Sequence, residues 1–267
     1  MTTKPGRHRP VQIPGIVVVV PCYNEERRLD AARLLTLLDD RRQQILFVDD
    51  GSTDGTRELL LGLFGTEPRV EVMSLGTNRG KGEAVRFGMR KAIENGAQIV
   101  AYLDADLASP PSELRRVLDR LEQSDDLAAA LGSRVRLLGC NIDRFPARHF
   151  QGRIFATIAS IMLGISVYDT QCGLKCFRTT DALREAISTP FRSRWVFDVE
   201  LLGRLVSCRN PLRPEAIVEV PLLEWQDIGG SRLGLRAKVR SLVDLLFIVG
   251  PQSRTLWPNR SPTRGSQ

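Results

Sequence analysis

Two aspartates lie two positions apart in the stretch AYLDADLASP, where an apolar run ends at Asp104 and Asp106. Carboxylates this close repel each other unless a cation lies between them. Mg²⁺ or Mn²⁺ held by one or two carboxylates keeps coordination positions free for the oxygens of a diphosphate. A turn capped by two aspartates is the simpler alternative, but other polar chain segments point to the same place. We therefore predict a metal site at Asp104 and Asp106.

A second acidic pair stands in FVDDGSTDGT, where Asp49 and Asp50 end an apolar run. Gly51, Ser52 and Asp54 are typical of a tight turn that leads into a helix. Such a turn explains these three residues but not the doubled aspartate. A carboxylate at this point can accept hydrogen bonds from a nucleobase edge or from a ribose.

The segment NRGKGEAVRFGM resembles a phosphate-binding loop, because its glycines permit close backbone approach and Arg79 and Lys81 supply positive charge. It matches neither the P-loop pattern nor the GxGxxG fingerprint of dinucleotide-binding proteins. The first strand-to-helix turn, PCYNEE, contains no glycine. These observations argue against a nicotinamide-dependent enzyme.

Short apolar runs alternate with segments in which apolar residues recur every three or four positions. We expect strands at 16–20, 45–48, 70–74, 99–103 and 128–131, and helices at 25–38, 56–64, 81–95 and 111–123. Continuous Val, Ile and Leu runs indicate strands covered on both faces, so the pattern predicts an α/β protein with a mostly parallel, doubly wound sheet. Ligands of such sheets bind beyond the carboxyl ends of the strands, which are here all polar.

The second half of the chain is less regular. After Arg134 we expect an apolar segment at 154–167, a helix near 180–188, a strand near 216–221 and an amphipathic helix at about 235–249. The predicted organisation is one catalytic domain over 15–249, with halves at 15–134 and 135–249. Disordered tails are expected at 1–14 and 250–267.

The 267-residue chain carries a net charge of +7, with a sequence pI near 9.5. This surplus suits nucleic acid, anionic lipid or phosphorylated ligands. A nucleic-acid-binding role leaves the acidic strand ends unexplained and is the remote alternative. The five scattered cysteines indicate free thiols rather than a zinc site or a disulfide framework. Neither a signal peptide nor a spanning helix is evident, which predicts a cytoplasmic protein.

Five segments in order, VVVVPCYNEE, ILFVDDGSTDGT, NRGKGEAVRFG, YLDADL and GSR, resemble the GT-A fold of family 2 glycosyltransferases, also called the nucleotide-diphospho-sugar transferase fold. The later segments DTQCGLKCF, RWVFDVELL, GGSRL and DLLFI are similar to the dolichyl-phosphate β-glucosyltransferase branch, which is related to the dolichyl-phosphate mannose synthases. The resemblance covers about residues 15–249. It implies an inverting, Mg²⁺- or Mn²⁺-dependent hexosyltransferase that uses UDP-glucose, or next GDP-mannose, and a polyprenyl-phosphate acceptor.

The resemblance also implies roles for the matching positions. On the donor side, the residues that would hold base, ribose, diphosphate and metal are Pro21, Tyr23, Glu25, Asp50, Arg79, Lys81, Asp104 and Asp106. The candidate catalytic residues are Asp106, Arg134, Asp169, Gln171 and Asp198. Trp195, Asp198 and Glu200 would line the acceptor side, although acids in a first helical turn also favour the helix dipole, so a catalytic role for Asp198 or Glu200 stays open.

The acceptor can be argued from chemistry. A hydroxyl acceptor needs a general base to lose its proton, whereas a polyprenyl phosphate is already an anion and needs cations. Arginines gather before the apolar segment 154–167 and would bind the phosphate, with Arg134, Arg148 and Arg153 as the chosen candidates. That segment is expected either to rest in the lipid headgroup layer or to form a core helix.

Two partner expectations follow. The protein is expected to touch the cytoplasmic face of a membrane peripherally, as part of cell-envelope chemistry, and not to bind nucleic acid. A family 2 glycosyltransferase with a non-lipid hydroxyl acceptor is the alternative function.

Overall fold

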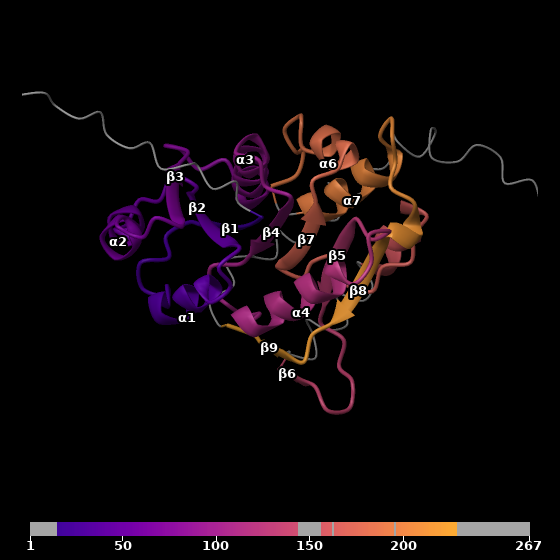
Figure 1. The fold of residues 1–267 in the computed structure, drawn as a ribbon, viewed down its shortest axis with the longest axis horizontal. Coiled ribbons are helices and arrows are strands. Elements are labelled where there is room, and N and C mark those ends of the chain that lie inside the picture. The colour runs from indigo at the N-terminus through magenta and orange to yellow at the C-terminus, as the bar shows by residue number, and fades with distance from the viewer. Residues whose placement is uncertain (1–14, 144–155, 162, 195, 229–267) are drawn as a thin grey trace, which may run out of the picture.

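The computed structural model describes residues 15–143, 156–161, 163–194 and 196–228. These residues build a seven-stranded sheet with helices on both faces (Figure 1). The strand order is β3-β2-β1-β4-β7-β5-β8, and every neighbouring pair is parallel except the two that involve β7. The strands are β1 (Ile16–Cys22), β2 (Gln43–Asp49), β3 (Val70–Ser74), β4 (Ile99–Leu103), β5 (Ala129–Ser133), β7 (Leu174–Arg178) and β8 (Ile217–Pro221).

Helices cover the sheet in two groups, each with its own apolar core. Helices α3 (Lys81–Glu94), α6 (Asp181–Ala186) and α7 (Phe197–Ser207) pack on one face. The other face carries α1 (Ala31–Leu35) with the 3₁₀ turn Thr36–Leu38, α2 (Thr56–Phe64) and α4 (Pro111–Glu122). A further 3₁₀ turn, Pro214–Ala216, precedes β8. The doubly wound α/β architecture predicted from the sequence is confirmed.

The β1 run IVVVV shows why the sheet is covered on both sides. Val17 and Val19 point into the core under α3 and α7, whereas Val18 and Val20 point into the core under α1, α2 and α4. All four side chains are buried. An uninterrupted apolar run is the expected sequence for a central strand of this kind.

A second, two-stranded sheet pairs β6 (Asn141–Asp143) in parallel with β9 (Glu224–Gln226). It lies next to α4 and beside the large sheet, at the lower edge of the molecule in Figure 1. The sequence did not indicate these strands, because three residues are too few to show an alternation.

Two sequence expectations need correction. The helix expected over 25–38 begins only at Ala31, where Asp30 caps it by accepting a hydrogen bond from the backbone N–H of Arg33 at 3.0 Å. A single turn precedes it, because the backbone N–H groups of Arg28 and Leu29 both donate to the Glu25 carbonyl, but this turn does not continue into the helix. The backbone N–H groups of Glu25 and Glu26 donate to the Thr56 hydroxyl. The segment that forms β7 had not been recognised as a strand, and it runs antiparallel to its neighbours.

The apolar segment expected at 154–167 is described in part. Ala159, Leu163, Ile165 and Val167 are buried in the core shared with α6 and α7, while Ile161 is exposed. These residues support the core-helix alternative over an interfacial helix. No helix within the described ranges is long and apolar enough to cross a bilayer. The helix expected at about 235–249 and both expected tails lie outside the described residues.

Candidate active site at the carboxyl edge of the sheet

The sheet topology brings the polar strand ends together. Strands β1, β2, β4 and β5 are linked through parallel pairs or through β7, so their carboxyl ends reach one edge. Because β7 is antiparallel, the segment that precedes it, 169–173, lies at the same edge. The backbone N–H of Asp104 donates to the Gly173 carbonyl at 3.0 Å, which joins the end of β4 to the start of β7.

Lys81 and Asp104 form the central ion pair of this edge. The Lys81 ammonium lies 2.6 Å from Oδ1 of Asp104 and 2.8 Å from Oδ2. Burial lowers the pKa of Lys81, but the carboxylates of Asp104, Asp198 and Asp106 together raise it above its ordinary value. Lys81 is therefore a fixed cation among acids at the first turn of α3.

The Asp104 carboxylate lies over Gly173. A Cβ atom at Gly173 would come within 2.1 Å of Oδ2 of Asp104, far inside van der Waals contact. Only glycine leaves room for this carboxylate to approach Lys81. The glycine in DTQCG is thus a steric requirement of the acidic pair.

Asp106 stands in the turn after β4. Its Oδ1 accepts a hydrogen bond from the backbone N–H of Ala108 at 3.1 Å, and Oδ2 accepts none from the described residues. Leu107 adopts the left-handed conformation, with φ of 52°, to make this turn. No group of three or more His, Cys, Asp or Glu side chains arranged for a metal occurs in the described part of the chain. A cation at this point would bind the carboxylates of Asp104 and Asp106, and Oδ2 of Asp106 accepts no hydrogen bond from the described residues.

The two aspartates that follow one another at the end of β2 form hydrogen bonds with different parts of the chain. Asp49 accepts from the Ser52 backbone N–H at 2.9 Å and from the Ser74 hydroxyl at 2.8 Å, which closes the turn and ties it to β3. Asp50 accepts from the backbone N–H groups of Arg79 and Gly80 at 2.7 and 2.8 Å. Burial raises the pKa of Asp50, although these two hydrogen bonds lower it in part.

The turns after β1 and β2 are held together by side chains. Asn24 accepts from the Thr53 backbone N–H at 2.8 Å, and its own N–H donates to the Ser52 hydroxyl at 2.9 Å. The Glu25 carboxylate takes both Nε and Nη2 of Arg28, at 3.0 and 2.6 Å. Pro21 and Tyr23, at the end of β1, are half-buried. The turns that carry Pro21, Tyr23, Glu25 and Asp50 therefore lie side by side and form the rim of the site.

Arg134 follows β5 and is bound by Asp169. The guanidinium donates through Nε to Oδ2 at 2.6 Å and through Nη2 to Oδ1 at 2.8 Å. The Trp225 ring faces the same guanidinium, 5.2 Å from its centre. Burial lowers the pKa of Arg134, but Asp169 raises it more, so the group is permanently charged.

Several polar atoms between Asp104 and Arg134 have no hydrogen-bond partner within the described residues. They are Nε2 of Gln171, Oγ1 of Thr170 and Oγ of Ser133, and all three are buried. Buried polar atoms are normally satisfied by protein, water or ligand. This part of the edge can therefore bind polar groups that the described residues do not provide.

Asp198 belongs to a buried network. Its Oδ1 accepts from the Lys175 ammonium at 2.8 Å and from the Tyr102 hydroxyl. Tyr102 and Lys175 are direct neighbours across β4 and β7, so both side chains rise from the same face of the sheet. The Lys175 ammonium also donates to the Cys172 carbonyl at 2.6 Å.

Glu200 has a role within the fold. Its Oε2 accepts from the Arg192 backbone N–H at 2.9 Å, and its Oε1 lies 2.7 Å from Nη2 of Arg204. The loop that contains Arg192 contacts the NRGKG segment, because Arg194 donates a hydrogen bond to the carbonyl of Asn78 at 3.1 Å. Glu200 therefore supports the site from behind.

The structure separates the two cations of NRGKG. The guanidinium of Arg79 stacks on the Phe87 ring at 5.3 Å, while Lys81 alone contacts the acidic pair. Arg148, Arg153 and Trp195, which were expected on the acceptor side, lie outside the described residues.

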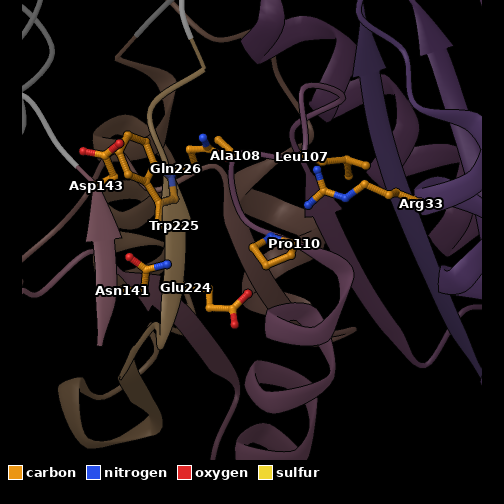
Figure 2. Close-up of a pocket in the computed structure, with 9 residues that line it drawn as sticks. All are labelled: Arg33, Leu107, Ala108, Pro110, Asn141, Asp143, Glu224, Trp225 and Gln226. Atoms are coloured by element: carbon orange, nitrogen blue, oxygen red, sulfur yellow. The ribbon is translucent and has the colours of Figure 1, made fainter. Parts of the chain in front are cut away.

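A pocket of about 240 Å³ lies beside the turn that holds Asp106 (Figure 2). Leu107, Ala108 and Pro110 form one wall, and the two strands of the small sheet, with Trp225 of β9, form another. Because Trp225 also contacts Arg134, the pocket adjoins the Arg134–Asp169 pair.

Sequence reasoning missed three residues of the site: Tyr102, Gly173 and Lys175. A lysine inside the apolar run GLKCF was the available signal, since a lone lysine in a buried strand needs a partner. Its partner, Asp198, lies 23 positions away and is identified only by the fold.

This edge of a mostly parallel sheet, with paired aspartates beside a lysine, is that of a GT-A sugar-nucleotide transferase. Residues 17–202 match the family described as Glycosyl transferase family 2, and the chain belongs to this family of enzymes.

Two curated relatives illustrate the similarity. A dolichyl-phosphate beta-glucosyltransferase of Trichomonas vaginalis is 31% identical over 90% of this chain and 72% of the relative. The human dolichyl-phosphate beta-glucosyltransferase is 33% identical over 86% of this chain and 74% of the relative.

Among solved structures, glucosyl-3-phosphoglycerate synthase from Mycobacterium tuberculosis, in complex with Mn²⁺, UDP and glucosyl-3-phosphoglycerate, has a TM-score of 0.62 at 20% identity. The similarity covers 92% of this chain and 82% of that one. At this identity the likeness concerns the fold.

Proposed function

We propose that this enzyme transfers a hexose, glucose before mannose, from a nucleotide sugar to a polyprenyl phosphate with inversion at the anomeric carbon. One observation carries the proposal: the similarity to dolichyl-phosphate beta-glucosyltransferases extends over 81–91% of the chain. It therefore includes both the donor rim and the part that follows Arg134. The paired aspartates and Lys81 suit a metal-bound diphosphate donor, and the guanidinium of Arg134, held by Asp169, suits an anionic acceptor.

The donor would lie along the rim formed by the turns after β1 and β2. Pro21, Tyr23 and Glu25 would contact the base and the ribose. Asp50 would contact the edge of the base and would hold the Arg79–Gly80 backbone beside the nucleotide. Lys81 would exchange part of its contact with Asp104 for a phosphate oxygen. Its ammonium would then stabilise the negative charge that develops on the leaving diphosphate.

The acidic pair fits a divalent cation. Asp106 has an oxygen that accepts no hydrogen bond from the described residues, and a hard cation of this kind commonly uses one or two carboxylates with phosphate oxygens. Asp104 and Asp106 would hold Mg²⁺ or Mn²⁺, which when bound stabilises the departing diphosphate. The Mn²⁺ and UDP named in the mycobacterial structure support this assignment by fold likeness only.

The acceptor phosphate would approach Arg134. Asp169 fixes this guanidinium through two hydrogen bonds and also accepts one from the Gln171 backbone N–H at 3.1 Å. The Gln171 side-chain nitrogen, which has no hydrogen-bond partner among the described residues, would bind the sugar. A phosphate nucleophile needs no general base. Asp198 would then position α7 and the sheet edge through Lys175 and Tyr102, rather than take a proton.

A transfer assay tests the function. Purified enzyme with Mg²⁺ or Mn²⁺ and a short-chain polyprenyl phosphate is offered radiolabelled UDP-glucose, GDP-mannose and other donors in turn. Label is counted in the organic phase with and without EDTA. Metal-dependent lipid label from one donor is the expected result.

The same assay separates the alternatives. If a nucleotide sugar binds but none of the donors yields organic-phase label, the lipid acceptor is overturned and a hydroxyl acceptor is favoured. Label that survives EDTA unchanged would overturn the metal assignment alone. A variant with Asp126→Asn, an exposed aspartate between α4 and β5, is the matched control for substitutions at the acidic pair.

A further inference from the structure

The connection between β5 and β6 ends in an exposed leucine pair. Leu138 is fully exposed, at 104% of its reference surface, and Leu137 is 50% exposed. Figure 1 shows this connection extending as a loop beyond β6 and β9 at the lower edge of the molecule. Two large apolar side chains at the tip of a projecting loop are not explained by the fold.

The tip has a defined shape. The Leu137 backbone N–H donates to the Val135 carbonyl at 3.1 Å, and the Cys140 N–H donates to the Leu137 carbonyl at 3.2 Å. Gly139 takes the left-handed conformation, with φ of 84°, to complete the turn. The two exposed leucines therefore stand on a hydrogen-bonded turn.

A third exposed leucine lies next to the base of the loop. Leu223 is 44% exposed, and its carbonyl accepts a hydrogen bond from the Asn141 backbone N–H at 2.6 Å. Its own N–H is held by the Glu113 carboxylate at 3.2 Å. An exposed leucine therefore also lies at the base of the loop, directly before β9 of the small sheet.

The loop tip is also cationic. Arg136 is exposed and forms no ion pair within the described residues, and the tip residues 135–140 include no acid. The acid that follows Leu223, Glu224, lines the pocket of Figure 2. An apolar tip with an arginine that forms no ion pair among the described residues is complementary to a surface that is anionic outside and apolar beneath.

The position of the loop agrees with such a surface. The loop begins directly after Arg134, which is held by Asp169 at the catalytic edge, and it ends at Asn141, which lines the pocket beside Asp106. A surface that touched the tip would therefore lie close to the acceptor side of the site.

We propose that residues 136–138 are a membrane-docking tip, which we call the Leu137–Leu138 tip, and that it inserts into the headgroup layer of an anionic bilayer. Arg136 contacts lipid phosphates while the leucines leave water. The choice of a lipid surface, rather than another apolar partner, rests in part on the proposed polyprenyl-phosphate acceptor. The geometry of the tip does not depend on that function.

Vesicle sedimentation tests the tip without catalysis. Full-length enzyme is mixed with phosphatidylcholine vesicles, or with vesicles that also contain phosphatidylserine, and neither nucleotide sugar nor polyprenyl phosphate is present. We expect binding to the anionic vesicles that weakens as salt rises. The variant Leu137→Ser/Leu138→Ser should bind at least about tenfold more weakly, because two apolar side chains no longer leave water.

The chain offers matched controls on α2, at the opposite end of the sheet. Leu61 and Leu63 are 43% and 45% exposed, so Leu61→Ser/Leu63→Ser makes the same chemical change far from the tip. Arg57, also exposed on α2, gives Arg57→Glu as the control for Arg136→Glu. Both control variants should bind vesicles as the unchanged protein does.

The outcomes separate this inference from the proposed function. Weaker vesicle binding by the tip variants alone supports the tip, even if the transfer assay yields no lipid product and the proposed function fails. Equal binding by tip variants and controls, or no binding by the unchanged protein, overturns it. Sizing by light scattering adds one more test: a dimer that dissociates on Leu137→Ser/Leu138→Ser, without a change in vesicle binding, would assign the tip to a second copy and also overturn the inference.

Discussion

The Lys175 ammonium lies 2.8 Å from Oδ1 of Asp198, and the Lys175 side chain is completely buried. This pair joins the start of β7 to the first turn of α7, beneath the edge where Lys81 meets Asp104. Burying both charges costs desolvation free energy, which their attraction offsets only in part, so we infer that the pair serves mainly to position the elements that it joins. It holds the catalytic edge and the helix behind it in one arrangement.

Removing the cation of this pair should destabilise the fold. We expect Lys175→Met to lower the free energy of unfolding by about 3–5 kcal/mol, because Asp198 is left charged and buried. Urea denaturation followed by circular dichroism measures this. Lys175→Met/Asp198→Asn should recover most of the loss, since no unpaired charge remains. A single variant as stable as the unchanged protein would show that the pair is not needed.

Removing one carboxylate of the acidic pair should stop transfer without unfolding the protein. Asp106→Asn is expected to lower turnover by at least about 10³-fold, because a cation ligand at the departing diphosphate is lost. EDTA should have the same effect on the unchanged enzyme, with activity restored by Mg²⁺ or Mn²⁺. The control Asp126→Asn should remain active. Full activity of Asp106→Asn would contradict the assignment of this site.

A methyl group at Gly173 should displace Asp104. Gly173→Ala places a Cβ within 2.1 Å of Oδ2 of Asp104, so we expect a large loss of turnover from a change that touches no charge. The matched change Gly62→Ala, in open space on α2, should stabilise the protein by about 0.5–1 kcal/mol and leave activity unchanged. Transfer assays and denaturation curves on both variants distinguish them. Equal activity of the two variants would mean that Asp104 can move without consequence.

Alkaline pH should destabilise the protein through its buried thiols. Burial is the largest cause that raises the pKa of Cys22, Cys172 and Cys176, to about 11 for Cys172. The unfolded chain releases these protons near about pH 8.5, whereas the folded chain keeps them, so stability is fully present below that pH. It then falls as pH rises through the folded pKa, by at most about 1.4 kcal/mol per pH unit for each thiol.

Denaturation curves between about pH 8.5 and 10.5 measure this dependence. Cys172→Ala should show a shallower fall in unfolding free energy than the unchanged protein. The same substitution at the half-buried Cys140 serves as the control for loss of a thiol. A fall that is equally steep in Cys172→Ala would rule out a contribution from this residue.

Local patterns in the chain were enough to predict the main architecture and the acidic groups at the edge of the sheet. The IVVVV run of β1 and the helical spacing after Lys81 each favour a single element, because local hydrophobic periodicity decides whether a segment is strand or helix. Polar strand ends at Asp50, Asp104 and Arg134 had to meet, since parallel strands end at one edge. The five cysteines were also predicted as free thiols, and all lie unpaired in the described residues.

The partners of these residues, in contrast, follow from the three-dimensional arrangement of the strands. Asp169 holds Arg134 across 35 positions, and Asp198 meets Lys175 across 23. Nothing local in the chain specifies such pairs, because they depend on the antiparallel insertion of β7 between β4 and β5. The same insertion brings Gly173 under the Asp104 carboxylate. Side-chain partners at long sequence separation are set by sheet order and register, which periodicity alone does not contain.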